Sequence, residues 1–454
     1  MSGGIGGRRT KLLKKSSYNL VVNLNEDQNL LVNTLSGAID QVPASYCSFI
    51  ESPYCHEKNE ITDFLTQRRY LIDSEIDEGE LLRRLYTEVQ DVARTKIPIK
   101  CVLLVTFDCN LRCAYCWQQH KINKSSAMTQ EKVDAIFETL PKLAANLNIE
   151  SDATPIIQLF GGEPLLPENT ALVEYILKKC KSRGYNVQIT TNGVYVPDFQ
   201  DMLLRYGVNE IQITVDGTAD FHNRRRVGSD YKSLMDSIGA LLFHNETYIK
   251  LRVNVDRGNL NSLPELANEI IDRRWYTSSK FFAYTTPLRD PSFDSQTLIN
   301  GRKELLAAFL DMKREYPQTE IFWFMGWDGY QPVIGLEYNG RFPYPKTYIC
   351  DININQFVFT PSGSIHLCAE ESQGEAGAVG SYYPAFSLDE PKFSSIYYKT
   401  PQELGRCEGC VMLPVCGGGC DLMTGNEPFL EAYCRSVRDC FAYGLADYIN
   451  HRGQ

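Results

Sequence analysis

The sequence predicts an α/β fold, because short apolar runs of β type alternate with helical segments along the middle of the chain. Strands and helices of this length, alternating in this way, form parallel sheets with right-handed crossovers. Six such units suit an open partial (β/α)6 TIM-like barrel better than a closed eightfold one. A small, weakly patterned α+β region precedes these units, and a cysteine-rich region with little regular pattern follows them.

The six expected strands are short runs rich in Val, Ile, Leu and Phe. They cover 101–107, 156–160, 187–191, 211–215, 249–255 and 280–284. The segments between them repeat apolar residues with a period near 3.6, as amphipathic helices do. Thr129 is a suitable N-cap for the first of these helices, and Gly184 and Gly207 are suitable ends for the next two.

The 454 residues divide into five regions. Residues 1–17 are Gly-rich and basic with no apolar run behind them, so they predict a flexible tail and not a signal peptide. Residues 18–95 predict a small α+β domain, with strands at 19–23 and 30–33 and helices near 44–52, 61–69 and 79–93. The barrel is assigned to 96–300, a bridging region to 301–345 and the cysteine-rich domain to 346–454.

The charge of the chain excludes one broad class of function. Lys and Arg number 46 against 56 Asp and Glu, which gives a formal charge of −10. A general nucleic-acid binder normally carries the opposite sign. No stretch approaches 18 consecutive apolar residues, the length that a spanning helix needs. We therefore expect a cytoplasmic protein that binds neither nucleic acid nor membrane.

The 15 cysteines do not suit an ordinary cytoplasmic enzyme. The cytosol is reducing, so disulfides are not expected there. Six of the cysteines crowd between Cys407 and Cys440. In a reducing compartment, such clustering indicates metal or iron–sulfur ligation.

The strongest signal is Cys109-Asn-Leu-Arg-Cys113-Ala-Tyr-Cys116, which follows the first expected strand directly. Active sites of βα barrels assemble at that end of the strands. Three thiolates on one loop can hold three irons of a [4Fe–4S] cluster and leave the fourth iron open. The alternative is a zinc site, which normally takes four protein ligands.

This cysteine spacing resembles that of the radical S-adenosylmethionine (radical SAM) superfamily. Gly161, Gly162, Glu163 and Pro164 follow the second strand and are similar to the family's methionine-binding motif. The resemblance implies that their backbone and Glu163 hold the amino group of S-adenosylmethionine, and that Tyr115 packs near the adenine. It implies further cofactor contacts for polar residues at the ends of the next strands, namely Asn192, Thr214, Asp216 and Arg252.

These assignments have plain alternatives. Asn192-Gly193 and Asp216-Gly217 are also ordinary turn dipeptides. Arg252 could be a solvated strand residue, and Tyr115 could serve loop packing alone. His222 and the run Arg224 to Arg226 resemble the polar, basic segment that follows the fourth strand in this branch of the superfamily.

The second strong signal lies at the C-terminus and resembles the seven-cysteine pattern of the SPASM domain. It consists of Cys350, Cys368 and the run Cys407-x2-Cys410-x5-Cys416-x3-Cys420-x13-Cys434. The resemblance implies two auxiliary [4Fe–4S] clusters. The first would be held by Cys350, Cys368 and Cys420, and the second by Cys407, Cys410, Cys416 and Cys434. Paired zinc ribbons are the alternative.

The first auxiliary cluster then has only three evident ligands. Cys440 is a candidate for the fourth, but it shares a helical face with apolar neighbours and could be a core residue. Asp351 and His366 are weaker candidates, and the iron could also be left open for a substrate thiolate. Four cysteines fit no cluster spacing and are expected to be small buried hydrophobes: Cys47, Cys55, Cys101 and Cys180.

The resemblance implies an oxidoreductase that cleaves S-adenosylmethionine to a 5′-deoxyadenosyl radical and removes hydrogen from a residue of a ribosomally made precursor peptide. Residues 18–95 resemble a leader-peptide recognition (RRE-like) domain, which would bind an extended leader at a sheet edge. A flavodoxin or ferredoxin is the expected electron donor. The expected outcome is an oxidative crosslink. The alternatives are a sulfatase-maturing enzyme that oxidises Cys or Ser to formylglycine, and a metal-binding scaffold without activity.

Overall fold

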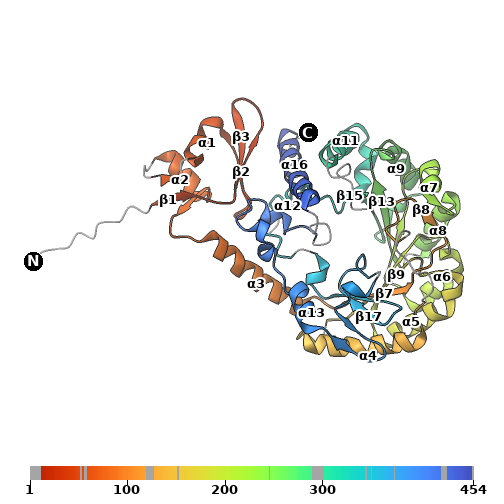
Figure 1. Cartoon of the computed structure of the whole chain (residues 1–454). Coiled ribbons are helices and arrows are strands. Elements are labelled where there is room, and N and C mark those ends of the chain that lie inside the picture. The colour runs from red at the N-terminus through yellow and green to blue at the C-terminus, as the bar shows by residue number, and fades with distance from the viewer. Residues whose placement is uncertain are drawn as a thin grey trace, which may run out of the picture.

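An eleven-stranded sheet forms the centre of the molecule, with the strand order β15-β14-β13-β11-β10-β9-β7-β16-β17-β18-β19. The computed structural model describes residues 12–51, 54–55, 59–118, 127–150, 153–244, 246–288, 301–342, 345–348, 350–372, 374–420 and 427–451. Every pair of neighbouring strands from β15 to β16 is parallel. Helices lie along the outer side of this curved sheet (Figure 1). The predicted α/β class is therefore confirmed, and the large parallel sheet is consistent with the predicted partial barrel.

All six predicted strands are present, and their ends differ from the prediction by a few residues at most. They are β7 (Lys100–Thr106), β9 (Ile156–Gly161), β10 (Asn186–Thr191), β11 (Glu210–Thr214), β13 (Tyr248–Val255) and β14 (Phe281–Pro287). In β9 and β10 buried residues alternate with more exposed ones, because one face of the sheet packs on helices and the other faces the barrel interior. β7 is buried almost throughout.

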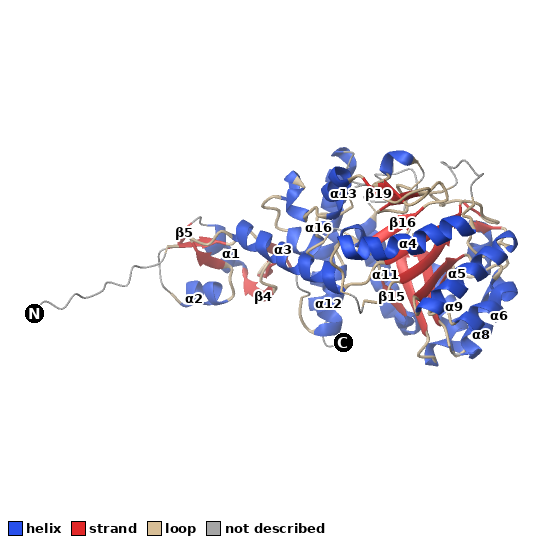
Figure 2. Ribbon diagram, turned by 90° about the horizontal axis from the view of Figure 1, so that it is seen from below, coloured by secondary structure: helices blue, strands red, loops and turns tan. Residues whose placement is uncertain are grey.

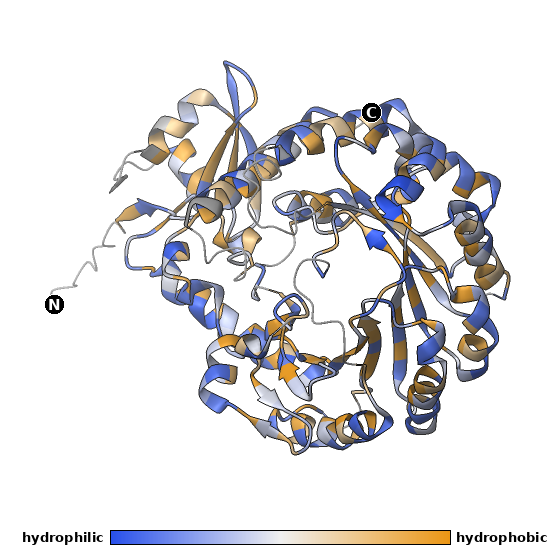
Figure 3. Ribbon diagram, turned by 45° about the vertical axis from the view of Figure 1, so that its right-hand side comes forward, coloured by the Kyte–Doolittle hydropathy of each residue, from blue (hydrophilic) through white to orange (hydrophobic). Residues whose placement is uncertain are grey.

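The helices between these strands cover the sheet as amphipathic elements. They are α4 (Gln130–Asn146), α5 (Thr170–Arg183), α6 (Val196–Tyr206), α7 (Ala219–Arg225), α8 (Tyr231–His244) and α9 (Leu263–Asp272). The Thr129 hydroxyl accepts a hydrogen bond from the Lys132 amide, as an N-cap does. Gly184 and Gly207 end α5 and α6 in the left-handed conformation. Apolar strands and polar outer helix faces can be followed in Figure 3.

Two short strands extend the sheet beyond the six that were predicted. β15 (Phe322–Phe324) pairs with β14, and β16 (Gln356–Phe359) pairs with β7 at the other edge. The antiparallel strands β17 (Ser364–His366), β18 (Gly380–Ser381) and β19 (Ser387–Leu388) follow β16. The cysteine-rich region is therefore joined to the barrel by backbone hydrogen bonds of one continuous sheet.

The remaining helices of the C-terminal half are α11 (Arg302–Glu315), α12 (Gln331–Asn339), α13 (Glu390–Tyr397), α14 (Leu413–Cys416) and α16 (Glu427–His451). α16 packs against α11 and α12, and Figure 2 shows these elements between the N-terminal region and the barrel. No helix among the described residues is long and apolar enough to cross a bilayer.

The N-terminal region contains two small antiparallel sheets, of order β2-β3-β4 and β5-β1-β6. Its strands are β1 (Leu13–Lys15), β2 (Asn19–Asn23), β3 (Gln28–Asn33), β4 (Ala38–Pro43), β5 (Tyr54–Cys55) and β6 (Leu71–Asp73). Its helices are α1 (Ala44–Glu51), α2 (Glu60–Gln67) and α3 (Glu78–Lys96), close to the predicted ranges. α3 then leads towards the barrel (Figure 1).

The expectation of a flexible tail over 1–17 is wrong for residues 12–17. Leu13 to Lys15 form β1, which pairs with β6 over three residues and with β5 over two. Ser16 is buried, and its hydroxyl donates a hydrogen bond to Glu78. Strand pairing over so few residues leaves no periodic signal in the sequence, which explains the error. Residues 1–11 lie outside the described residues.

Candidate active site

The cysteine loop and the Gly161–Pro164 segment are held together by their backbones. The Gly162 amide donates to the Thr106 carbonyl and the Glu163 amide donates to the Asp108 carbonyl, both at 2.8 Å. A Cβ atom on Gly162 would lie 2.1 Å from the Asp108 oxygen, and one on Gly161 would lie 2.2 Å from the Thr106 oxygen. Only glycine fits at either position, because the chain that leaves β7 passes directly over them.

The three loop cysteines lie together at the carboxyl end of β7. Burial raises the pKa of Cys113 to about 11, and the thiols of Cys116 and Cys109 contribute to this shift. The short strand β8 (Arg112–Cys113) pairs with β12 (Arg226–Val227), which places Arg226 beside Cys113. Cys109 is exposed whereas Cys113 is buried, so the loop presents Cys109 towards the outside.

Glu163 joins the ends of two neighbouring strands. Its carboxylate is 1% exposed and accepts hydrogen bonds from the Thr191 hydroxyl at 2.6 Å, the Asn192 amide at 2.7 Å and the Leu165 amide at 2.9 Å. Burial raises the pKa of this carboxyl, and the hydrogen bonds oppose that shift. The carboxylate therefore fixes β9 to β10, while the expected bond to an amino group stays a prediction.

A buried polar network fixes Tyr115. Its hydroxyl donates to Asp216, which is fully buried, and accepts from Arg226 at 2.7 Å and from Asn254 at 3.3 Å. Both the amide and the side chain of Asn254 donate to Asp216, at 3.2 and 3.1 Å. Burial raises the pKa of Tyr115 well above its usual value. The ring of Tyr115 is therefore anchored to the ends of β11 and β13.

The polar residues predicted at successive strand ends do converge. The Asn192 side chain donates to Asn110 at 2.7 Å and points at the Cys109 sulfur at 3.8 Å. Thr214 pairs with Arg252 in the β11–β13 register, and the Arg252 Nε donates to Asn254 at 3.0 Å. Sequence reasoning missed Asn254, although an Asn near the end of a buried strand was an available signal.

Two further groups lie under this network. His222 is fully buried, with the Asp216 amide donating to its Nδ1 at 3.3 Å and Ser229 beside its Nε2 at 2.8 Å. Among the residues that the structure describes, the buried Nε of Arg226 has no hydrogen-bond partner. A cationic donor left unpaired beside Cys113 fits an anionic thiolate cluster at this loop.

The division of the C-terminal cysteines into two ligand groups stays a prediction, and electrostatic effects link some members of each group. Burial raises the pKa of Cys350 to about 11 and that of Cys368 to about 12, and the Cys420 thiol contributes to both shifts. In the other group, Cys410 contributes to the raised pKa of Cys434, and Cys434 to that of Cys416. Three thiols of this other group, those of Cys416, Cys407 and Cys410, also raise the pKa of Tyr86 in α3.

Three consecutive glycines connect the two groups. Gly417, Gly418 and Gly419 lie between Cys416 and Cys420 with φ values of +68°, +87° and +81°. A Cβ atom on each would lie 2.7 Å from a side chain, of Lys346, Leu404 and Tyr433 respectively. Three left-handed residues in succession require glycine, and they turn the chain tightly from one group into the other.

The candidates for a fourth ligand of the first group lie in different surroundings. Cys440 is 3% exposed in the core of α16, among Val437, Phe441 and Leu445. His366 is buried, and its burial lowers its pKa. The Glu375 carboxylate raises this pKa and the Lys392 ammonium lowers it. Asp351 is near Cys350 but exposed, and its carboxylate lies 3.9 Å from the Lys100 ammonium.

No three His, Cys, Asp or Glu side chains in the described ranges lie close enough together to hold a single metal ion. The thiolates of a cubane cluster bind different irons and therefore lie farther apart than the ligands of one ion.

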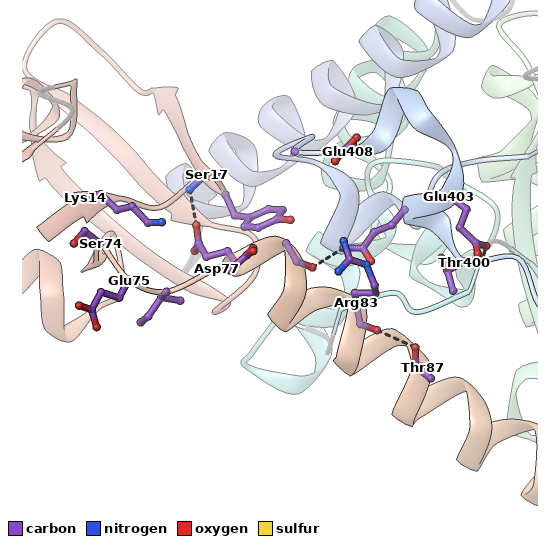
Figure 4. A pocket seen from close by; sticks show the side chains of 16 residues that line it. Lys14, Ser17, Ser74, Glu75, Asp77, Arg83, Thr87, Thr400, Glu403 and Glu408 are labelled. Carbon is purple, nitrogen blue, oxygen red and sulfur yellow. Dashed lines mark hydrogen bonds between the residues drawn. The ribbon is translucent and has the colours of Figure 1, made fainter.

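A cavity of about 760 Å³ lies between the N-terminal region and the cysteine-rich segment (Figure 4). Acidic side chains outnumber basic ones in its lining, which includes Glu75, Asp77, Glu78, Glu403, Glu408, Lys14 and Arg83. Gln402 on one wall donates to the Gly79 carbonyl on the other at 3.0 Å. Gly409, between Cys407 and Cys410, completes the lining, so the cavity adjoins the second cysteine group.

Part of this chain is similar to a known family. Residues 103–243 match the Radical SAM superfamily. The GTP 3′,8-cyclase of Geobacter sulfurreducens is 28% identical over 207 residues, 45% of this chain and 60% of that protein. The enzyme of the same name from Alkaliphilus oremlandii is 28% identical over 33% of this chain and 45% of that protein. The chain spans about half the length of the curated relatives it matches.

Two groups of solved structures share the fold. The structure titled native anSMEcpe with bound AdoMet has a TM-score of 0.56 at 18% identity, over 78% of this chain and 99% of that one. Streptococcus suis SuiB bound to precursor peptide SuiA has a TM-score of 0.52 at 14% identity, over 92% of this chain and 98% of that one. Residues 97–454 make up less than four fifths of this chain, so the second match includes part of the N-terminal region.

Proposed function

We propose that this protein, whose residues 103–243 match the Radical SAM superfamily, is a peptide maturase that forms an oxidative crosslink in a ribosomally made precursor peptide. The crosslink would be a thioether or a carbon–carbon bond. One observation carries the proposal: the cysteine loop follows β7, and Cys350 and Cys368 flank β16 and β17, which continue the same sheet beside β7.

The barrel mouth would hold a [4Fe–4S] cluster and S-adenosylmethionine. Together, when bound and reduced, they supply a 5′-deoxyadenosyl radical that removes hydrogen from carbon. Cys109, Cys113 and Cys116 would bind three irons. The Gly161–Pro164 segment would hold the methionine part. Tyr115, Asn192, Thr214, Asp216 and Arg252 would bind and orient the rest of the cofactor. The buried polar network beneath them keeps this mouth preorganised.

We assign residues 346–454 to a SPASM domain with two auxiliary clusters. Cys407, Cys410, Cys416 and Cys434 would hold the second cluster, and Cys350, Cys368 and Cys420 three irons of the first. The burial of Cys440 in the core of α16 supports an open fourth iron, to which a substrate thiolate could bind. Spectroscopy of the clusters with and without a Cys-containing peptide tests this, and an unchanged spectrum on peptide addition would contradict it.

The N-terminal region is the proposed site for the peptide leader. Its sheet β2-β3-β4 has two edge strands, and an extended peptide can add to such an edge through backbone hydrogen bonds. The acidic cavity beside α3 would suit basic residues of the same peptide. The fold match to SuiB, solved with its precursor peptide, supports this assignment because it extends into the N-terminal region. A flavodoxin or ferredoxin would supply electrons.

Two other functions remain to be tested against this one. The fold match to anSMEcpe, solved with a Cys-containing peptide, favours the sulfatase-maturing alternative, oxidation of Cys or Ser to formylglycine. That match covers 78% of this chain, less than the match to SuiB. A non-catalytic metal scaffold predicts colourless, zinc-loaded protein, whereas three cubane clusters predict a brown protein with about twelve irons.

The decisive experiment is anaerobic incubation of the reconstituted protein with S-adenosylmethionine, a reductant and the precursor peptide encoded beside its gene, followed by mass spectrometry. The expected result is a loss of two hydrogens from the peptide together with fragment ions that join two of its residues, because oxidation of Ser to formylglycine also removes two hydrogens but joins no residues. The matched control replaces Cys109, Cys113 and Cys116 with Ala, which leaves the C-terminal cysteines in place and should abolish the product. An unchanged peptide mass with about twelve irons bound would contradict crosslinking.

A further inference from the structure

A row of side chains crosses the barrel face of the sheet at the level of two proposed cofactor residues. Thr214 of β11 pairs with Arg252 of β13, Arg252 pairs with Tyr284 of β14, and Tyr284 pairs with Trp323 of β15. Side chains that pair in register point to the same face of a sheet. The row therefore leads from the proposed cofactor residues Thr214 and Arg252 directly to Trp323.

Trp323 is an exposed aromatic side chain on this face. Its neighbours along β15, Phe322 and Phe324, are buried in the hydrophobic core, and the ring of Phe324 contacts that of Phe309 in α11. Because side chains alternate along a strand, Trp323 points to the opposite face, into the barrel. It is 42% exposed there, and the ring of Tyr338 in α12, which is 45% exposed, stacks on it with centroids 4.6 Å apart. Two large rings are therefore accessible on one side of the barrel interior.

Two further rings extend this surface towards the cofactor residues. The ring centroid of Phe282 lies 5.7 Å from that of Trp323 and 6.0 Å from that of Tyr284. The Tyr284 hydroxyl donates to the Gln212 side chain at 2.7 Å, which holds this ring towards β11. These four rings, of Phe282, Tyr284, Trp323 and Tyr338, form one surface that we call the aromatic wall.

The two cations that adjoin the aromatic wall on β13 already have partners. The Lys250 ammonium lies 2.7 Å from the Glu210 carboxylate, and the Arg252 Nε donates to Asn254 at 3.0 Å. Neighbouring strands lie about 4.8 Å apart, so the backbone of Trp323 is about 10 Å from that of Arg252. An uncharged ring bound to the aromatic wall would therefore lie beside the cofactor without breaking either contact.

We propose that the aromatic wall binds an aromatic side chain of the precursor peptide and thereby presents a neighbouring residue of that peptide to the cofactor. The inference rests on the proposed function, because it requires a peptide substrate. Aromatic rings attract each other at centroid distances of about 4.5–7 Å, and the rings of the wall already pack at such distances. Trp323 and Tyr338 would then determine specificity by binding alone, and they would make and break no bond.

The test measures kcat/KM of the full, reconstituted chain for the precursor peptide encoded beside its gene, read as the 5′-deoxyadenosine that the peptide induces. This readout does not depend on which bond forms in the peptide. Trp323→Ala and, separately, Tyr338→Ala should each lower kcat/KM about tenfold, which corresponds to about 1.4 kcal/mol. Trp323→Phe keeps a ring and should stay within about threefold of the parent protein. Tyr276→Ala is the matched control and should leave kcat/KM unchanged, because Tyr276 is an exposed ring before the amino end of β14.

Altered peptides, each with one aromatic residue replaced by Ala, separate binding from folding. At least one of them should lose about tenfold in kcat/KM with the parent protein, and Trp323→Ala should lower its kcat/KM no further. Parent-like values for the natural peptide in both Ala variants, or a further tenfold loss with every altered peptide, would overturn the inference. So would full recovery when Lys replaces the critical aromatic residue, because the wall would then bind a cation. A parent protein in which the natural peptide induces no 5′-deoxyadenosine would instead refute the peptide substrate, and this inference with it.

Discussion

Gly162 offers the sharpest test of how the cysteine loop is held. In Gly162→Ala the new methyl carbon would lie 2.1 Å from the Asp108 carbonyl oxygen and 2.6 Å from that of Phe107. These are backbone atoms, so no side chain can rotate away and the loop itself must retreat. The φ angle of Gly162 lies outside the left-handed region. The steric clash is therefore the whole effect of the substitution.

The size of the loss in stability follows from the contacts that would break when the cysteine loop moves away from Gly162. Overpacking of this kind typically costs about 1–3 kcal/mol, and the hydrogen bonds from the Gly162 and Glu163 amides contribute about 1 kcal/mol each. We expect a loss of about 3 kcal/mol in the free energy of unfolding of the barrel, or roughly 6–12 °C in its melting temperature. The loop should also bind its cluster poorly, because Cys109 would move away from Asn192.

Thermal unfolding and iron content per chain are the assays, together with the change in the cluster's electron paramagnetic resonance signal when S-adenosylmethionine is added. The control is Gly374→Ala, since nothing lies within 4 Å of a Cβ atom at Gly374. Gly162→Ala should keep about eight irons, those of the C-terminal cysteines, and lose the S-adenosylmethionine-dependent signal. A variant that matches Gly374→Ala in both melting temperature and signal would refute the reasoning.

Three other predictions concern single side chains. Burial lowers the pKa of His222 to about 3. The contribution of neutral His222 to the free energy of unfolding is therefore complete above about pH 6.5 and falls by up to about 1.4 kcal/mol per pH unit as the pH drops towards 3. Between pH 7 and 5 the urea midpoint should fall less in His222→Gln than in the parent protein, and equal slopes would contradict this. Cys407→Ser should lose about four irons and Cys440→Ser none; equal losses in iron analysis would make Cys440 a ligand. Asp216→Asn should destabilise the protein by about 3 kcal/mol, because the buried carboxylate accepts hydrogen bonds from Tyr115 and Asn254; a urea midpoint equal to that of the parent would contradict this.

The sequence predicted the barrel strands and the residues at their ends, because buried strands and amphipathic helices leave strong periodic patterns. The elements that it missed are short. β15 and β16 span three and four residues, and β1 spans three, which is too few for a period to show. Each of these short strands forms because the edge of another strand is free to pair with it. The sequence of the short segment alone does not show that such an edge is nearby.

Within the candidate site, the sequence predicts which residues belong to the site better than it predicts which other residues they contact. The Gly161–Gly162 pair was recognised by resemblance, whereas its physical reason, the chain that passes over it, depends on the register between β7 and β9. Glu163 was assigned to the cofactor, yet three protein donors surround it. Such hydrogen bonds join residues from different strands, and spacing along one strand carries no information about them.

The pairing of β16 with β7 protects the barrel as well as extending it. Lys100–Thr106 is a nearly continuous buried run of apolar residues, and β16 covers one of its two edges. A long apolar strand with an uncovered edge is a template for pairing with another chain. A barrel produced without the residues after 345 should therefore self-associate through β7. We therefore expect the cysteine-rich segment to reduce aggregation of the barrel, whether or not iron is bound to it.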